Sequence, residues 1–361
     1  MKSNRRVSLT FIVAVAAILS LSAPSALRAA DAGATAANLS LSAPKVTAET
    51  PVGEYVGTYV AADGKTMLGV AKVYVDPAVK PDGGYRAALY AVESGLMHGA
   101  VIGGKTKCES SVLLTGTWEQ GTAKEPYVRL RLADDKWQGG IDGDKCVVGS
   151  KAGVFDLKRY QRKSPTLGAA PPAGAIVLLD YKPGKAPSLA EWTNDKWKAF
   201  DDGSIMVAKG NNNTVRTFRN FRLHAEFMVV RDKGGGNSGF YLLDRYEVQV
   251  LDSFGLNPAK GNCAAVYLTF APSANACLPA GQWQTYDTTF RAPVMEGKEV
   301  KKRPRITVVH NGVRVHDDVE IPHATGHAQV RGDVAEGPIM LQDHGSLARF
   351  RNIWLVEIAG Q

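Results

Sequence analysis

Alternating hydrophobic and polar positions run along most of the chain and predict β-strands. Across Gly53–Tyr160, short β-prone runs are separated by turn signals such as Asp63-Gly64 and Asp142-Gly143. Convincing helical periodicity is absent from this stretch. Residues 51–162 are therefore predicted to form a small antiparallel β domain, with a barrel as one arrangement of its strands.

The same alternation resumes at Ala175 and continues as many short strands, Ala264–Leu268 among them. Asn311-Gly312 lies between two β-prone runs and is a strong signal for a two-residue hairpin. Residues 163–174 are rich in Pro, Gly and Ala and are predicted to be a linker. Residues 175–361 are predicted to form a two-sheet jelly roll, so that the fold class is all-β.

The N-terminus has a different pattern. A basic stretch within residues 2–6 precedes the apolar run Val7–Leu21, which is typical of a secretory signal peptide, here predicted for residues 1–30. Residues 31–50 are rich in Ala, Ser and Thr and are predicted to be a flexible leader. The apolar run is too short for a comfortable membrane span, and no longer one follows. A mature protein in the periplasm or secreted, without a membrane span, is predicted.

Export changes what the charge and the cysteines mean. The formal net charge of +8 owes much to basic residues that leave with the signal peptide. No Lys/Arg run with interleaved aromatic residues indicates a nucleic-acid partner. Four cysteines in an exported chain indicate disulfides, and pairs inside one domain would be Cys108 with Cys146 and Cys263 with Cys277. Zinc is the rival interpretation, but no C-x-x-C spacing occurs.

The stretch Gly234–Gly255 carries most of the candidate chemistry. Side chains alternate along a strand, so Glu247 and Gln249 share one face with Arg245, while Val248 and its neighbours suit a core. In a β-sandwich, polar residues from other strands converge on such a face, and the candidates here are Asn237, Ser238, Tyr246, Asp252, Gln284, Tyr286, Gln342 and His344. Carboxylates and amides bind sugar hydroxyls, and rings stack on sugars, so a carbohydrate cleft fits this set. A satisfied polar network explains it equally well.

Three other motifs carry less weight. Gly234-x-Gly236-x-x-Gly239 fits a dinucleotide fingerprint, but a β-prone run follows where a helix is needed. Arg331-Gly332-Asp333 is a tripeptide that arises by chance. His323 and His327 have a ligand-like spacing, but no third ligand follows locally.

Residues 175–359 resemble the 3-keto-disaccharide hydrolase domain family. The motifs that carry the resemblance are Gly236-Asn237-Ser238-Gly239, Arg245–Ser253, Trp283–Asp287, His310-Asn311-Gly312, Gly337–Gly345 and Phe350–Ile353. The resemblance implies a concanavalin A-like jelly roll with a concave carbohydrate face, and an exported enzyme with a carbohydrate substrate. It does not cover the N-terminal β domain.

The chemistry that the resemblance implies needs one base. Retaining glucanases of this fold place acids at alternate strand positions, but the position after Glu247 in that alternation is Gln249. In a 3-keto sugar the ketone acidifies the C2 proton, so a base can remove it, the C1 aglycone leaves by elimination, and water then adds. Glu247 or His344 is the candidate base or acid. A divalent metal ion held by carboxylate and His is a further candidate electrophile.

Asn237, Arg245 and Gln249 would orient the sugar hydroxyls and the keto oxygen in this reaction. Two other functions stay open, a non-catalytic lectin-like carbohydrate-binding protein and an ordinary glucanase of the same fold. Product formation from a 3-keto-disaccharide separates an enzyme from a lectin.

Overall fold

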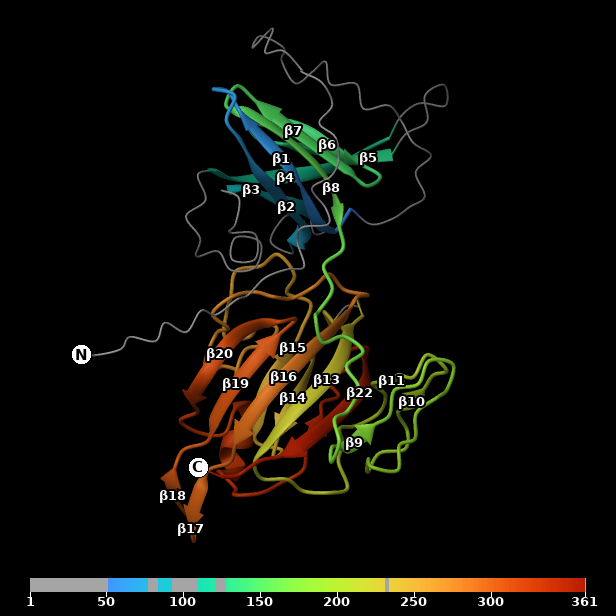
Figure 1. The fold of residues 1–361 in the computed structure, drawn as a ribbon, viewed down its shortest axis with the longest axis vertical. Coiled ribbons are helices and arrows are strands. Elements are labelled where there is room, and N and C mark those ends of the chain that lie inside the picture. Colours follow the sequence, from blue (N-terminus) through green and yellow to red (C-terminus); the bar gives the residue numbers. More distant parts are fainter. Residues whose placement is uncertain (1–50, 77–83, 93–109, 121–127, 231–233, 361) are drawn as a thin grey trace, which may run out of the picture. The chain divides into compact units, whose positions relative to one another are not determined.

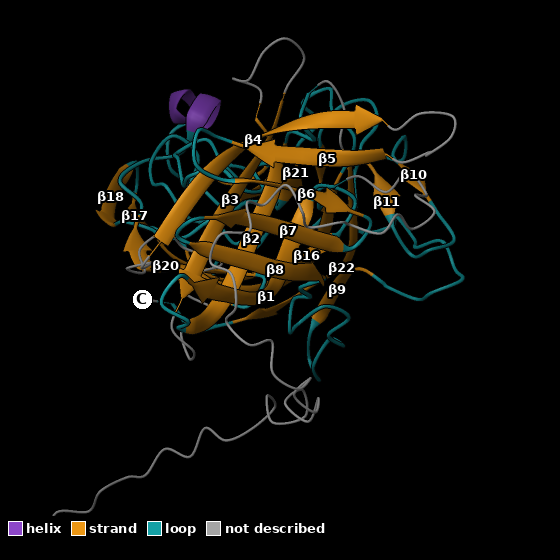
Figure 2. Ribbon diagram, turned by 90° about the horizontal axis from the view of Figure 1, so that it is seen from above, coloured by secondary structure: helices purple, strands orange, loops and turns teal. Residues whose placement is uncertain are grey.

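The computed structural model describes residues 51–76, 84–92, 110–120, 128–230 and 234–360. The predicted signal peptide, the predicted leader and Cys108 lie outside these residues. Within them, strands make up nearly all the regular structure, and the one helical element is the short 3-10 helix η2 (Gly326–Arg331), drawn in purple in Figure 2. No helix in this part of the chain has the length and apolar character to cross a lipid bilayer.

Eight consecutive antiparallel strands close into a barrel in the N-terminal half (Figure 1). Each strand pairs with the next, and the last returns to the first, from Glu54↔Tyr160 to Ala61↔Gly153. The strands are β1 (Gly53–Ala61), β2 (Thr66–Asp76), β3 (Gly84–Val92), β4 (Ser110–Gln120), β5 (Val128–Ala133), β6 (Gln138–Asp142), β7 (Lys145–Ser150) and β8 (Gly153–Tyr160). Closure removes the unpaired strand edges on which other chains could pair.

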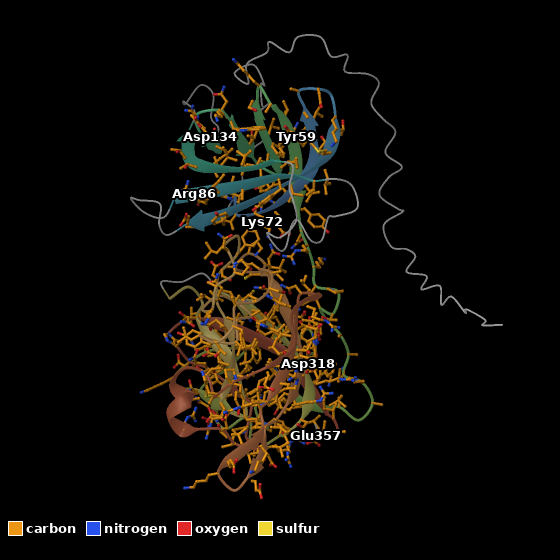
Figure 3. The ribbon with its side chains drawn as sticks, turned by 90° about the vertical axis from the view of Figure 1, so that its left-hand side faces the viewer. Tyr59, Lys72, Arg86, Asp134, Asp318 and Glu357 are labelled. Atoms are coloured by element: carbon orange, nitrogen blue, oxygen red, sulfur yellow. The ribbon has the colours of Figure 1, made fainter. Side chains whose placement is uncertain are left out.

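The barrel interior is packed with apolar side chains that alternate along the strands. Tyr59, which is labelled in Figure 3, lies 4.5 Å from Phe155 between ring centroids, and Trp137 lies 5.5 Å from Phe155. Cys146 is a buried thiol in the same cluster, and burial raises its pKa to about 12. These contacts give the barrel a hydrophobic core of its own.

Two antiparallel sheets form the C-terminal half. The larger has the order β10-β11-β22-β13-β16-β19-β20, with β9 also paired to β22, and the smaller has the order β12-β21-β14-β15. The larger sheet comprises β9 (Ile176–Leu179), β10 (Lys198–Ala199), β11 (Ile205–Met206), β13 (Phe221–Val229), β16 (Trp283–Arg291), β19 (Arg305–His310), β20 (Val313–Glu320) and β22 (Ala348–Glu357). The smaller comprises β12 (Asn212–Asn213), β14 (Ser238–Leu242), β15 (Tyr246–Val250) and β21 (Met340–Leu341), and β17 (Val294–Glu296) pairs with β18 (Glu299–Lys302) separately.

Aromatic side chains from both sheets pack between them. Phe240 of the smaller sheet lies 6.2 Å from Phe227, 5.8 Å from Tyr286 and 5.2 Å from Phe350 of the larger sheet, measured between ring centroids. Two sheets packed face to face around such a core form a β-sandwich. The predicted all-β class, a sandwich preceded by a small antiparallel domain, is confirmed.

Local turn chemistry explains one success and one error of the strand predictions. Asn311 and Gly312 have φ values of 51° and 82° and join β19 to β20, as a type I′ hairpin turn requires. The predicted strand Ala264–Leu268 is wrong, because Ala264 and Leu268 have φ values of 65° and 55° and interrupt the extended backbone. Isolated backbone hydrogen bonds connect that segment to β15, and the two do not form a regular ladder.

The segment predicted as a linker, residues 163–174, lies against the outer face of the larger sheet. Thr166 Oγ1 donates a hydrogen bond of 2.6 Å to Asp287 Oδ2, and the Gly168 amide donates one of 2.5 Å to Glu226 Oε1. The segment therefore covers polar side chains of β13 and β16.

Candidate active site

The β14–β15 hairpin presents one face to the core and one away from it. Tyr246, Val248 and Val250 belong to the core. In the pairing of the two strands, Tyr241 lies opposite Glu247 and Gly239 opposite Gln249. Because side chains alternate, these two pairs share the face that points away from the core.

Glu247 is enclosed although it carries a carboxyl group. Its side chain is 1% exposed, and a Cβ atom at Gly239 would lie 2.5 Å from Glu247 Oε1. A side chain at position 239 would collide with Glu247, because the Glu247 carboxyl group packs directly against the β14 backbone there. Two further segments cover the residue, since the Tyr267 amide donates to its carbonyl at 3.1 Å and its own amide donates to Thr325 Oγ1 at 2.8 Å.

Few donors reach this carboxyl group. Tyr241 lies opposite it in the β14–β15 pair, and Oε2 has no partner among the described residues. Burial raises the pKa of Glu247 to about 7, against the opposing effect of the nearby Tyr241 hydroxyl. A carboxyl group with a pKa near neutrality exchanges a proton readily at neutral pH, which is what general acid–base catalysis needs.

Three predicted site residues lie around β14, the strand that pairs with β15. The backbone amide of Gln342 donates to the Gly239 carbonyl at 3.0 Å, and its side-chain Nε2 donates to the Tyr241 hydroxyl at 3.2 Å. Asn237 lies two residues before Gly239, so the alternation of side chains places it on the same face. Its Nδ2 atom lies 3.4 Å from Nδ1 of the exposed His344. The hairpin and the segment after β21 thus bring these residues together.

Unpartnered oxygen atoms mark this face. Glu247 Oε2, Gln342 Oε1 and Asn237 Oδ1 are all buried, and none has a hydrogen-bond partner in the described part of the chain. Native proteins leave few such atoms, so each invites an explanation. All three accept hydrogen bonds, and a ligand with several hydroxyl donors would satisfy them.

Three predicted site residues point elsewhere. Tyr246 and Tyr286 lie in the core, where their hydroxyls donate hydrogen bonds of 2.6 Å to Asp333 Oδ1 and to the Gln249 carbonyl. Gln284 is fully buried on β16, and its side-chain oxygen accepts hydrogen bonds from neighbouring core residues. Protein partners engage these groups on the core side, so these residues do not line the Glu247 face.

Three more have local structural contacts. Ser238 Oγ donates to the Gln342 carbonyl at 2.7 Å and ties β14 to the segment after β21. Arg245 lies in the turn rather than in the strand, and its Nε donates to the Gly332 carbonyl at 2.9 Å. Asp252 lies beyond the end of β15 and is half-buried.

The turn between β14 and β15 has an unusual backbone. Leu243 and Asp244 have φ values of 55° and 54°, a region that side chains larger than glycine rarely occupy. Arg331 pairs with the Asp244 carboxylate, and Asp333 accepts the Tyr246 hydroxyl, so η2 and its following residues hold this turn. The Arg331-Gly332-Asp333 tripeptide is therefore a structural anchor. Strained backbone of this kind concentrates at functional sites.

Sequence reasoning missed Tyr241 and Gly326. Tyr241 lies two residues after Gly239, so strand alternation could have placed it on the same face. Gly326 has no such signal, because it comes from a distant segment. A Cβ atom there would lie 3.9 Å from Glu247 Oε2 and 3.2 Å from Cδ1 of Tyr267, so its lack of a side chain keeps the space beside Oε2 free.

The predicted disulfide between Cys263 and Cys277 is absent, and both residues are free, buried thiols. Cys263 Sγ lies 3.1 Å from the Tyr286 hydroxyl, and Cys277 Sγ donates to the Leu278 carbonyl at 3.3 Å. Each thiol thus has a hydrogen-bond partner of its own. Cys146 is also a free thiol, and its predicted partner lies outside the described residues.

A metal electrophile would need a cluster of ligating side chains. Across the described ranges, no group of three or more His, Cys, Asp and Glu side chains is placed to hold a metal ion. Of the two histidines with a ligand-like spacing, His323 has its Nδ1 atom 2.9 Å from the Ala324 carbonyl.

A second cluster of titratable side chains lies on the outer face of the larger sheet. His224 Nδ1 lies 2.7 Å from Asp287 Oδ1, while Asn352 Nδ2 and Arg351 Nε donate to Glu226 at 2.8 and 2.7 Å. Burial raises the pKa of Glu226, but its hydrogen bonds outweigh burial and leave the pKa below its usual value. Glu226 is saturated with donors, which indicates a structural role.

Comparisons with known proteins found a matching family model and several similar solved structures. A family model described as a 3-keto-alpha-glucoside-1,2-lyase-like domain matches residues 174–356. A solved structure from Parabacteroides distasonis, proposed in its description to be a glycosyl hydrolase, is 34% identical with a TM-score of 0.46, over 52% of this chain and 85% of that one. A second from the same organism and with the same description is 16% identical with a TM-score of 0.37, over 52% and 95%.

The carbohydrate binding module CBM66 from Bacillus subtilis is 15% identical with a TM-score of 0.27, over 45% of this chain and 93% of that one. Among curated proteins, none matches significantly.

The matched range contains both sheets of the sandwich and covers half of the chain. It includes Glu247, Gln342 and His344. The family domain has a concanavalin A-like fold, so the predicted fold is confirmed, and the protein is carbohydrate-active. The chain belongs to the 3-keto-alpha-glucoside-1,2-lyase-like domain family.

Proposed function

We propose that the protein cleaves the glycosidic bond of 3-keto-glycosides by elimination, with Glu247 as the base. The main support is the buried Glu247 carboxyl group, whose Oε2 atom has no partner in the described ranges and whose pKa is raised to about 7. A retaining glycosidase needs a second carboxyl group about 5 Å away. The next position on the same face of β15 is Gln249, so this strand does not supply one.

The proposed reaction begins at the C2–H bond, which the C3 ketone acidifies. Glu247 Oε2 takes the C2 proton, and the electron pair of that bond forms the enolate. The enolate then collapses to a C1–C2 double bond and expels the C1 oxygen, which takes a proton from a donor. His344, exposed beside Asn237, is the candidate donor. Water adds to the resulting enone and gives the free 3-keto sugar.

Amide side chains would position the sugar and the enolate. Gln249 Oε1 accepts a hydrogen bond of 3.0 Å from the Val250 amide, which leaves Nε2 as a donor for the keto oxygen. The empty acceptor atoms of Gln342 and Asn237 would bind hydroxyl groups. A neutral polyhydroxy substrate matches this set of donors and acceptors.

The test is the Glu247→Gln variant with a 3-keto-glucoside. Loss of a general base lowers turnover by about 10²–10⁴-fold, and the isosteric amide keeps the shape of the site. Glu357→Gln is the matched control, because Glu357 is exposed at the end of β22 (Figure 3). Unchanged turnover in Glu247→Gln would remove Glu247 from the mechanism.

Two further measurements separate the alternative functions. Deuterium uptake at C2 from heavy water is expected if a base removes that proton. Sugar binding without product would support the lectin-like alternative, and equal cleavage of an unoxidised glucoside would support an ordinary glucanase.

We also propose that the protein is exported to the periplasm or secreted. The support is the signal-peptide pattern of residues 1–30. N-terminal sequencing of the purified native protein tests export. An intact N-terminus would contradict the proposal.

A further inference from the structure

We propose that the outer face of the larger sheet carries a second binding site, which takes the carboxylate group of an acidic sugar. The site consists of Arg351 on β22, Trp283 on β16 and Tyr181, which follows β9. Trp283 and Arg351 belong to two of the motifs that carry the family resemblance, and neither lies on the Glu247 face. The inference goes beyond the cleavage of 3-keto-glycosides and does not depend on it.

The strand order of the larger sheet brings these residues together (Figure 1). β22 pairs with both β9 and β13, and β13 pairs with β16. Arg351 lies opposite Glu226, which in turn lies opposite Thr285. Trp283 is two residues from Thr285 on β16, so it points to the same face. This is the outer face, because the neighbouring residue of β22, Phe350, belongs to the core.

Two aromatic rings hold the Arg351 guanidinium group. Its central carbon lies 4.0 Å from the centroid of the Trp283 ring and 4.3 Å from that of Tyr181. Contacts at this distance between a cation and an aromatic ring are attractive. Tyr181 is itself fixed, because a Cβ atom at Gly203 would lie 2.7 Å from its Cδ2 atom, so the ring packs on the backbone there. The guanidinium group is therefore held in place before a ligand binds.

Glu226 anchors Arg351 from below. Arg351 Nε donates to Glu226 Oε2 at 2.7 Å. The other oxygen of this carboxylate accepts the Gly168 amide at 2.5 Å and Asn352 Nδ2 at 2.8 Å. Glu226 thus fixes one nitrogen of the guanidinium group and leaves Nη1 and Nη2, which form the end of the fork, for another partner.

Several donors of this site have no partner. Within the described ranges, nothing hydrogen-bonds to Nη1 or Nη2 of Arg351, to Nε1 of Trp283 or to the Tyr181 hydroxyl. All three side chains are partly exposed, Arg351 by 11%. Guanidinium and indole nitrogens only donate hydrogen bonds, so the site requires a ligand with acceptors. The Glu247 face is the opposite case, because its unpartnered atoms are acceptors.

A sugar acid matches both parts of the site. A carboxylate accepts two parallel hydrogen bonds from the fork of a guanidinium group, and such charge-assisted pairs are strong. The partly exposed Trp283 and Tyr181 rings offer apolar surface beside that position, on which a sugar ring can stack. The protein is carbohydrate-active, so a uronic acid unit is the ligand that supplies the carboxylate and the ring together.

The test is the binding of trigalacturonic acid to the full chain, measured by isothermal titration calorimetry. Galactotriose, the neutral counterpart, is the control ligand. The acid should bind about tenfold or more tightly than the neutral sugar, because hydrogen bonds between a guanidinium group and a carboxylate are charge-assisted. Its affinity should fall when the salt concentration rises from about 50 to about 500 mM, because salt screens partly exposed charges.

Two matched variants locate the site. Arg351→Lys keeps the positive charge but removes the fork, so binding of the acid should weaken about tenfold or more. Arg349→Lys is the control, because Arg349 lies two residues away on β22 and its Nη2 already donates to Asp202 Oδ2 at 2.8 Å. Arg349→Lys and Glu247→Gln should both bind the acid as tightly as the wild type, since Glu247 lies on the other sheet.

Other outcomes decide against the inference. Equal affinity for the two trisaccharides, or no binding of the acid at millimolar concentration, would overturn it. An equal loss in Arg351→Lys and Arg349→Lys would indicate unspecific charge attraction, and a loss in Glu247→Gln would assign the ligand to the Glu247 face. If Arg351→Lys does not fold, Trp283→Phe keeps a ring and removes the Nε1 donor. That variant should bind the acid about threefold more weakly, and unchanged affinity would contradict the site.

Discussion

Two buried glutamates on opposite sheets of the sandwich differ in how their carboxyl groups are satisfied. Glu226 on β13 is 0% exposed and Glu247 on β15 is 1% exposed, so burial alone does not separate them. Glu226 accepts hydrogen bonds from Asn352, Arg351 and the Gly168 amide, and its pKa lies below the usual value. Glu247 Oε2 has no hydrogen-bond partner among the described residues, and burial raises the pKa of Glu247 to about 7.

The number of donors therefore decides the role of each carboxyl group. A buried carboxylate that is saturated with donors is stable as an ion and joins strands and segments together. A buried carboxyl group with an unpartnered oxygen is unstable as an ion, and it gains a partner when a ligand binds. This difference distinguishes a structural polar cluster from a candidate active site in the same domain.

The largest expected effect is on stability at Glu226. Glu226→Gln removes the buried carboxylate partner of the half-buried Arg351, and breaking a buried ion pair costs about 3–5 kcal/mol. Urea unfolding at pH 7 measures the change, with Glu357→Gln as the exposed control. A loss no larger than that of the control would mean that the cluster is not a structural element.

Glu247→Gln should have the opposite effect on stability. The native pKa is raised from 4.5 to about 7, so the folded state binds more protons than the unfolded state in this window. The free energy of unfolding of the wild type should fall as pH rises from 4.5 to 7, by at most about 3 kcal/mol. Glu247→Gln should lack this fall, as measured by unfolding across that pH range. An identical slope in the variant would contradict the raised pKa.

Gly239→Ala should displace the Glu247 carboxyl group. The added Cβ atom would lie 2.5 Å from Oε1, and the side chain has to move. We expect a loss of turnover of about tenfold or more, because a misplaced base loses the orientation that catalysis needs. Gly261→Ala is the matched control, since a Cβ atom there has no neighbour within 4 Å. Equal turnover in both variants would show that this contact does not position Glu247.

The smallest effect is expected at His224. Burial lowers its pKa, but the hydrogen bonds to Asp287 and Glu226 outweigh burial and leave it raised above 6.5. Its charged form should stabilise the fold below pH 6.5, and this contribution should be lost as pH rises through the native pKa. NMR titration of the histidine rings checks the shift. His316 is the contrast, because burial lowers its pKa. A His224 that titrates below 6.5 would contradict the cluster.

Much of the local structure follows from short-range patterns. Alternation identifies β15 and the face of Glu247 and Gln249, because side-chain direction in a strand depends only on its period. Asn311-Gly312 identifies a hairpin, because few residues accept the backbone of its turn. The segment Ala264–Leu268 shows the limit, since its composition is β-prone while its backbone includes two left-handed residues.

The candidate site is predicted only in part for the same reason. Glu247 and Gln249 share one face of β15, Gln342 hydrogen-bonds to Tyr241 on the paired strand, and Asn237 lies 3.4 Å from His344. Tyr246, Tyr286 and Gln284 resemble them in the sequence but lie in the core, where distant segments supply their partners. Long-range pairing decides which polar side chain is satisfied, and no local pattern encodes it.

The sequence by itself determined most of the β-strands, the all-β class and the one acid on the β15 face. The tertiary structure decided that this acid is buried, because Gly239, Thr325 and Tyr267 come from other segments and close around it. It also decided that Glu226 is saturated and Glu247 is not. The physical reason is that the state of a buried carboxyl group depends on the donors around it, and strand pairing and loop packing bring those donors from distant positions.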